Sequence, residues 1–140
     1  LSPNVTDIAE MAKAAEAGGA DAISLINTLL GMKIDINTRR PVLNNNMGGM
    51  SGPAVMPVAV RMVYQVRQAV KLPIIGMGGI TTGEDAVEFL LAGADAVSVG
   101  TAGIVDPYAC IKVRNGINDY LDKNGYESVN DIVGKLEMNN

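Results

Sequence analysis

Short apolar runs alternate with amphipathic segments along most of the sequence. Three of these runs have the length of strands buried on both faces of a sheet, at residues 20–26, 73–77 and 94–99. Apolar residues at helical spacing lie between and after them, so helices are expected over residues 8–17, 54–70, 83–92 and 107–122. This alternation predicts an α/β fold built on a parallel sheet.

The clearest unit covers residues 73–103. Its first strand ends in a glycine pair and leads to a helix, for which Thr82 is the expected N-cap and Asp85 the capping-box partner. Gly93 stands where a left-handed glycine ends a helix, and the second strand follows directly. Such a unit predicts two parallel strands joined by a right-handed crossover.

Two small-residue turns, Gly78-Gly79 and Gly100-Thr101, follow the two strands of this unit. Because the strands are parallel, both turns should lie at the same edge of the sheet. Bare glycine lets a ligand approach the backbone, and consecutive N–H groups in such turns can hold a phosphate. The turns therefore predict a phosphate site, with simple chain reversal as the alternative.

The start of the chain repeats this arrangement of a capped helix, a glycine turn and a strand. Thr6-Asp7 can cap the first helix, and its inward face should carry Ile8, Met11, Ala12 and Ala15. Residues 17–25 match residues 92–99 in their helix end, turn and strand, apart from one extra glycine. Asn27-Thr28 stands at the end of this strand. An internal echo of this kind is expected of repeated βα units.

Residues 29–53 form a long polar and glycine-rich segment between a strand and a helix. A short strand is possible near residues 32–36, and a connection of this length is uncommon unless it has a function. We expect it at the same edge of the sheet as the glycine turns. The apolar stripe of the helix that follows should lie in the core, at Val55, Ala59, Met62, Val63, Val66 and Val70.

Composition narrows the possible functions. The net charge is −4 and no basic run is present, so nucleic-acid binding is not expected. No apolar run is long enough to span a membrane, and the single cysteine fits a reducing cytoplasm. Histidine is absent, which excludes Ser-His or Cys-His catalysis within this chain. Cys110 is expected to be a buried structural thiol.

The number of units predicts part of a larger architecture. Three strands with their helices are expected in 140 residues, whereas a complete (β/α)8 barrel takes roughly 250 residues. We therefore predict the C-terminal half of a (β/α)8 TIM-type barrel, with three to four βα units in one domain over residues 1–140. The open strand edges of such a half would be covered by a missing N-terminal half or by a second copy, or would make the chain poorly soluble.

Five motifs together resemble one enzyme family, the dihydroorotate dehydrogenases. They lie at residues 1–4, 25–28, 48–53, 74–80 and 99–102, in the order and spacing of that family. The resemblance covers essentially the whole chain and is greatest to the catalytic subunit of class 1B, the NAD-linked type. It implies an FMN enzyme that oxidises dihydroorotate to orotate in pyrimidine synthesis.

The resemblance also implies site residues. FMN would be bound by Ile26, Gly52, Gly78, Gly79, Gly100 and Thr101. The last four would hold its phosphate, and the first two would approach it through their backbone. Asn27 and Thr28 would bind the orotate ring, since an Asn amide offers both the donor and the acceptor that a pyrimidine dione needs. No residue is assigned to a metal.

No catalytic residue is expected within this chain. In this family the base that takes the substrate proton is a cysteine of the N-terminal half, and Cys110 does not match its position. The flavin lysine of the family directly precedes the motif at residues 1–4. The resemblance further implies a homodimer of catalytic subunits, joined in a heterotetramer by electron-transfer subunits with FAD and a 2Fe–2S cluster. The 140 residues alone are expected to be inactive.

Two other readings remain open from the sequence. A phosphate-binding barrel enzyme without flavin would keep both glycine turns but would not need Asn27-Thr28 and residues 49–52 where they stand. A non-catalytic fragment would have no activity at all. A dihydrouridine synthase is disfavoured, because the chain is acidic and lacks a basic face for RNA.

Overall fold

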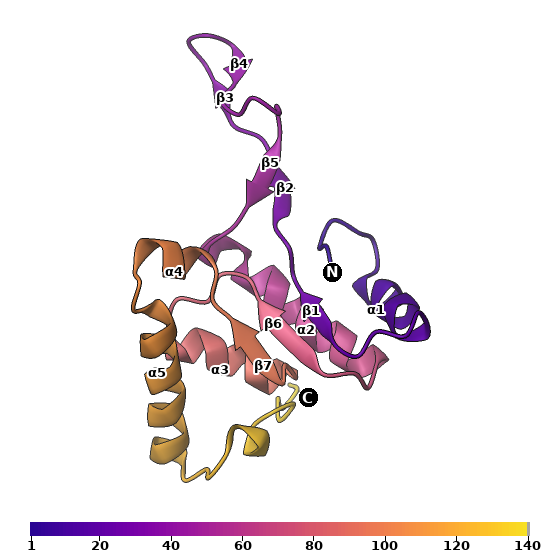
Figure 1. Cartoon of the computed structure of the whole chain (residues 1–140), viewed down its shortest axis with the longest axis vertical. Coiled ribbons are helices and arrows are strands. Elements are labelled where there is room, and N and C mark those ends of the chain that lie inside the picture. The colour runs from indigo at the N-terminus through magenta and orange to yellow at the C-terminus, as the bar shows by residue number, and fades with distance from the viewer. Residues whose placement is uncertain (140) are drawn as a thin grey trace.

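A sheet of three parallel strands forms the centre of the molecule, in a computed structural model that describes residues 1–139 (Figure 1). Its strands are β1 (Ile23–Leu25), β6 (Ile74–Met77) and β7 (Ala96–Ser98), in the order β1-β6-β7. Ser24 pairs with Ile75, which in turn pairs with Ala96. The predicted α/β class and the parallel pairing are confirmed.

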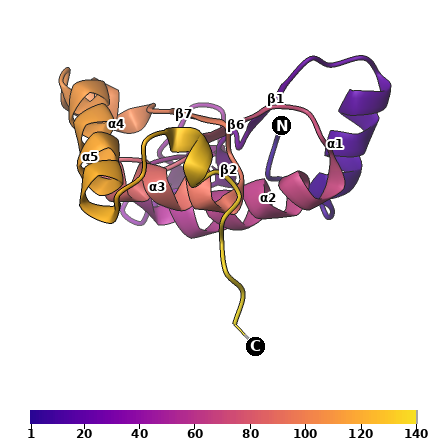
Figure 2. The same ribbon diagram turned by 90° about the horizontal axis from the view of Figure 1, so that it is seen from below.

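Five α-helices and two short 3-10 helices surround this sheet in residues 1–139. They are α1 (Ile8–Ala17), α2 (Met56–Ala69), α3 (Gly83–Ala92), α4 (Thr101–Val105) and α5 (Ala109–Asn124), with 3-10 turns at Pro53–Val55 and Val129–Asp131. Figure 2 shows α2 and α3 side by side along one face of the sheet. None of these helices combines the length and the apolarity needed to cross a bilayer.

The core lies between the sheet and the helices. Leu25 and Ile74 point into it and are fully buried, whereas Ser24 and Ile75 lie on the opposite face, where Ile75 is 36% exposed. The predicted stripe of α2 is buried throughout, at Val55, Ala59, Met62, Val63, Val66 and Val70. In α1 the expected inward position of Met11 is wrong: this side chain is 43% exposed.

The predicted helix caps are present. Asp7 accepts hydrogen bonds from two amides of the first turn of α1, and Gly93 ends α3 in the left-handed conformation. At the start of α3, Thr82 accepts from the Asp85 amide, and the Asp85 carboxylate accepts from the amides of Thr81 and Thr82. Burial raises the pKa of Asp85, but these hydrogen bonds outweigh it and leave the pKa below its ordinary value.

Helices α3 and α5 meet at two glycines. A Cβ added to Gly83 would lie 2.4 Å from the Cα of Gly116, and one added to Gly116 would lie 2.8 Å from the Cα of Gly83. No side chain fits between the two backbones at this point. The contact lets Phe89 and Leu90 of α3 and Val113 of α5 remain buried nearby.

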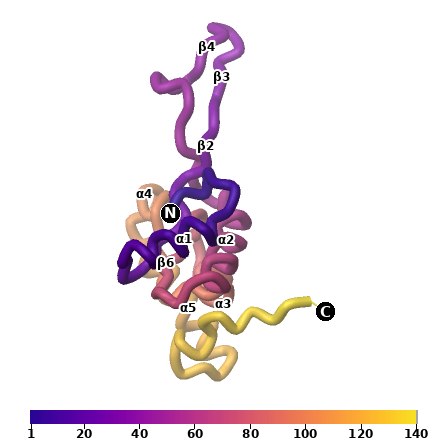
Figure 3. The backbone as a smooth tube through the Cα atoms, turned by 90° about the vertical axis from the view of Figure 1, so that its right-hand side faces the viewer, coloured from indigo at the N-terminus to yellow at the C-terminus, as the bar shows by residue number. Residues whose placement is uncertain are grey.

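Residues 29–50 form an arm that stands away from the body (Figures 1 and 3). At its base β2 (Leu29–Gly31) pairs antiparallel with β5 (Gly48–Met50), and near its tip β3 (Ile34–Asp35) pairs antiparallel with β4 (Arg40–Pro41). The expected strand near residues 32–36 corresponds to β3. The second hairpin layer at the base was not expected.

Two other expectations fail in the C-terminal part. Cys110 is exposed rather than buried, because the groove that it lines with Val97 and Val113 is open. Residues 101–105 form a short helix where only a turn was expected, so the last long helix begins at Ala109. The predicted end of that helix is confirmed, since Gly125 closes it in the left-handed conformation.

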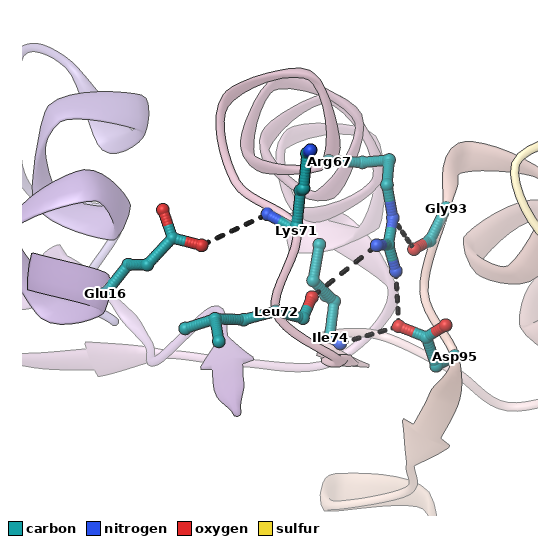
Figure 4. Close-up of polar contacts among 7 residues, drawn as sticks. All are labelled: Glu16, Arg67, Lys71, Leu72, Ile74, Gly93 and Asp95. Atoms are coloured by element: carbon teal, nitrogen blue, oxygen red, sulfur yellow. Dashed lines mark hydrogen bonds and ion pairs between the residues drawn. The ribbon is translucent and has the colours of Figure 1, made fainter. Parts of the chain in front are cut away.

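At the amino ends of β6 and β7, side chains and backbone groups form hydrogen bonds and an ion pair with one another (Figure 4). The Arg67 guanidinium donates to the Gly93 carbonyl over 2.7 Å and forms an ion pair with Asp95. The same Asp95 oxygen accepts from the Ile74 amide at 2.7 Å. One carboxylate therefore ties α2 to both the strand β6 and the turn before β7.

Candidate functional site

A pocket of about 880 Å³ lies at the opposite, carboxyl ends of the three strands. It is lined by the ends of β1, β6 and β7, by helix α4 and by residues 50–53, where the arm returns to the body. We call residues 50–53 the return of the arm. All eight residues that the sequence singles out line this one pocket: Ile26, Asn27, Thr28, Gly52, Gly78, Gly79, Gly100 and Thr101. Their binding roles stay predictions, but their convergence is a feature of the fold.

The glycine pair after β6 adopts backbone angles that other residues rarely reach. Gly78 has a φ of 127° and Gly79 a φ of 88°. A Cβ on Gly79 would lie 2.8 Å from the Gly52 carbonyl oxygen. Within residues 1–139 the amides of Gly78, Gly79 and Gly100 donate to no protein acceptor. The pocket thus offers free N–H donors at two neighbouring turns, which suits an anion.

The side chain of Thr101 faces the return of the arm. Its hydroxyl donates to the Ser51 hydroxyl over 2.9 Å, and Gly52 beside it has a φ of 90°. A Cβ on Gly52 would approach the Thr101 methyl to 4.0 Å. The arm and the second glycine turn therefore meet directly at the pocket.

Asn27 and Thr28 continue from the end of β1 into the pocket. The Asn27 side-chain oxygen accepts from the Thr28 amide at 2.7 Å, and in residues 1–139 its NH₂ group has no protein acceptor. Asn4 fixes the next step of the chain: its NH₂ donates to the Thr28 carbonyl and its oxygen accepts from the Leu30 amide, both at 2.9 Å. This leaves the Asn27 NH₂ free for a ligand.

Thr28 also touches the arm. A Cβ added to Gly49 would lie 2.1 Å from the Thr28 side-chain oxygen, so only glycine leaves room for Thr28 in its place. Behind these two residues Ile26 is buried, and its amide donates to the Met77 carbonyl over 2.9 Å. The expected place of residues 49–52 at this edge of the sheet is confirmed.

Several residues of the pocket were not singled out from the sequence. They include Leu1, Met50, Ser51, Met77, Ile104, Val105 and Asp106. The side-chain hydrogen bond from Lys112, with another from the Tyr108 amide, lowers the pKa of Asp106, so this carboxylate stays ionised. Position next to the motifs could have indicated Met50 and Ser51. Nothing in the local pattern pointed to Ile104 and Val105.

The walls of the pocket are mostly apolar, and over residues 1–139 no Lys or Arg side chain lines it. An anion would be held by backbone N–H groups and hydroxyls rather than by cations. The described residues contain no cluster of three or more His, Cys, Asp or Glu that could hold a metal ion. Cys110 lies outside this pocket, in a shallow groove with Val97 and Val113.

A parallel α/β sheet with a pocket at its carboxyl edge is the arrangement typical of α/β enzymes. Comparison with known proteins gives the family. The model of the family described as dihydroorotate dehydrogenase matches residues 1–121. The chain belongs to the dihydroorotate dehydrogenase family, as its motifs indicated.

Relatives of known name agree with this. A protein of Lachnoclostridium phytofermentans named dihydroorotate dehydrogenase B (NAD(+)), catalytic subunit, is 66% identical over 96% of this chain and 45% of its own length. A protein of Phocaeicola vulgatus with the same name is 62% identical over 99% of this chain and 46% of its own length. Dihydroorotate dehydrogenase A (fumarate) of Lactobacillus helveticus is 59% identical over 99% of this chain and 45% of its own length. The chain thus spans just under half the length of these relatives.

Proposed function

We propose that this chain supplies the C-terminal half of a (β/α)8 barrel that binds FMN and oxidises dihydroorotate to orotate in de novo pyrimidine (UMP) biosynthesis. Residues 1–140 belong to that single barrel. The observation that carries the proposal is the one pocket that all eight predicted residues line. The family match over residues 1–121 supports it.

The pocket fits FMN in its donors, its walls and its size. The free amides of Gly78, Gly79 and Gly100 and the Thr101 hydroxyl suit the phosphate. A Cβ at Gly79 would fill the space beside Gly52, and the apolar walls suit a flavin ring. Ile26 and Gly52 approach it through their backbone. When bound, FMN supplies the acceptor for the electrons of the substrate.

The substrate ring is held by Asn27 and Thr28. The free NH₂ group of Asn27 donates to a ring carbonyl, and the Thr28 hydroxyl offers both a donor and an acceptor. Asn4 and Gly49 keep this segment in place, the first by hydrogen bonds and the second by leaving space. The segment after β1 and the base of the arm therefore orient the substrate.

No residue of this chain is assigned as the base that takes the substrate proton. Cys110 is exposed and lies outside the pocket. By resemblance the base is a cysteine of the other half of the barrel. We expect the 140 residues alone to show no dihydroorotate-dependent turnover, and clear turnover would contradict this assignment.

We propose NAD, reached through a partner subunit, as the final electron acceptor. The relatives named with NAD(+) are 59% to 66% identical to this chain and the fumarate type is 59% identical, so some NAD-linked relatives are the more similar. The proposal includes a cytoplasmic heterotetramer, in which a homodimer of catalytic subunits passes electrons to a partner subunit that carries FAD and a 2Fe–2S cluster.

Titration of the purified chain with FMN tests the proposal. Saturable binding, followed by flavin fluorescence, should raise the melting temperature, because ligand at a hundred times Kd adds about 2.7 kcal/mol to the free energy of unfolding. Orotate should then perturb the flavin spectrum. Asn27→Ala should abolish that perturbation and leave FMN binding intact.

The rival functions give other results. A flavin-free phosphate-binding enzyme would bind inorganic phosphate but show no preference for FMN. An inert fragment would bind neither FMN nor orotate. The first result would reject the proposal, and the second would show that the other half of the barrel is needed to build the site.

A further inference from the structure

Two hydroxyl groups face each other where the arm returns to the pocket. The side-chain oxygens of Thr101 and Ser51 lie 2.9 Å apart, within hydrogen-bond distance. Both residues line the pocket, and Ser51 directly precedes Gly52, whose backbone angles are restricted to glycine. The backbone at the return of the arm therefore places Ser51 beside Thr101.

The number of protons in this pair matters. Each hydroxyl carries one proton and can accept as well as donate. When Thr101 donates to Ser51, its proton is not available to a phosphate. When Ser51 donates to Thr101 instead, the Thr101 proton is free. The Thr101 oxygen then accepts one hydrogen bond while its O–H donates another, which strengthens the donor.

We propose that Ser51 is a positioning residue for the flavin phosphate: it acts through Thr101, by donating its hydrogen bond to the Thr101 oxygen so that the Thr101 proton points to the phosphate. This inference rests on the proposed function. It assigns a role to a residue of the arm's return, and it links that return to the glycine turn at Gly100.

The orientation of the Thr101 hydroxyl matters because no cationic side chain of residues 1–139 lines the pocket. Without Lys or Arg at the pocket, these residues offer the phosphate only neutral donors. A hydrogen bond to a charged group is worth more than a neutral one, so a correctly oriented Thr101 hydroxyl has a measurable effect. Ser51 sets that orientation.

Comparison of FMN with riboflavin tests the proposal, because riboflavin has the same ring but no phosphate. Ser51→Ala should weaken FMN binding about fivefold, as expected for the loss of one supporting hydrogen bond. Riboflavin binding should not change. Ser51→Thr keeps the hydroxyl and should restore FMN affinity. In Thr101→Val, the further change Ser51→Ala should have no added effect on FMN.

Ser128→Ala is the matched control, since Ser128 caps a distant 3-10 turn. It should leave the ratio of FMN to riboflavin affinity unchanged. An equal loss for both flavins in Ser51→Ala would show a merely structural role and overturn the inference. Unchanged FMN affinity in Ser51→Ala would overturn it too, while the proposed function stood. Failure of the unaltered chain to bind FMN would reject FMN binding by this half of the barrel, and the inference with it.

Discussion

The two ends of the parallel sheet use polar groups in opposite ways. At the amino ends, Asp95 joins Arg67 and the Ile74 amide, and Glu16 accepts from the Lys71 amide at 3.2 Å (Figure 4). At the carboxyl ends, the glycine turns keep N–H groups without a protein acceptor in the described residues.

This difference assigns stability to one end and binding to the other. A donor that is already paired within the protein gains little from a ligand, whereas a free donor at a pocket gains a hydrogen bond when the ligand arrives. The division is the one known for barrels, in which the carboxyl face carries function. Variants at the two ends should therefore change different measurements.

The largest effect is expected at the amino end. Asp95→Ala removes the carboxylate shared by Arg67 and the Ile74 amide, and should lower the free energy of unfolding by about 2 kcal/mol in urea denaturation. FMN affinity of the folded chain should stay the same. Asp21→Ala is the matched control, because Asp21 holds the place of Asp95 in the repeated motif, is exposed and makes no side-chain hydrogen bond or ion pair within residues 1–139. A loss of FMN affinity in Asp95→Ala would contradict the assignment of stability to the amino end and of binding to the carboxyl end.

The next effect is expected at the carboxyl end. Gly49→Ala places a methyl group where the Thr28 side chain lies, and should weaken orotate binding about tenfold, since small displacements of positioning residues have large effects. Gly31→Ala on the paired strand β2 would meet only ordinary contacts, at 3.8 Å or more, and serves as control. Orotate-induced change in the flavin spectrum measures both. Equal orotate affinities in the two variants would contradict the role given to Gly49.

A smaller effect concerns the capping box of α3, between the two ends. The pKa of Asp85 lies below its ordinary value of 3.8, so this carboxylate adds stability above that pH and loses it as the pH falls through the lowered pKa. Asp85→Asn should lower the free energy of unfolding by about 1 kcal/mol at pH 7. The difference from the unaltered chain should shrink near pH 3. Asp122→Asn, an exposed change without such contacts, should follow the unaltered chain at both pH values.

The sequence predicted the body of the fold well, for a physical reason. The stripe of α2 from Val55 to Val70 buries a continuous apolar surface, so periodicity alone identifies it. The apolar run at residues 74–77 marks a strand, but this strand is buried at Ile74 and Gly76 and not at Ile75, so the expected burial on both faces is wrong. The caps at Thr82 and Gly93 depend on local hydrogen bonds and backbone angles, which neighbouring residues determine. Both kinds of feature are visible in a short window of sequence.

The arm was harder to predict because its strands have only two or three residues each. Such strands are stabilised by their partners rather than by their own pattern, and the pairing of Leu29 with Met50 joins residues far apart in the chain. The exposure of Cys110 was missed because Cys110 shares a helical face with the buried Val113. Periodicity identifies such a face, but it does not show how far along the helix that face is covered by other elements.

The site was predicted in part. Residues at the ends of parallel strands share one edge, so the glycine turns and Asn27-Thr28 had to converge once the strands were known. The hydrogen bond from Thr101 to Ser51 and the clamp of Asn4 on the segment after β1 depend on side-chain geometry across the pocket. No local pattern encodes them.

The contact between Gly83 and Gly116 has a consequence for the history of this chain. Because each backbone occupies the space that a methyl group on the other would need, neither position can accept another residue while its partner stays in place. A single substitution at either position would force α3 and α5 apart, and no second change at the other would bring them back. We therefore expect neither position to accept a substitution during evolution. Relatives that keep this helix pair at the same separation should carry glycine at both.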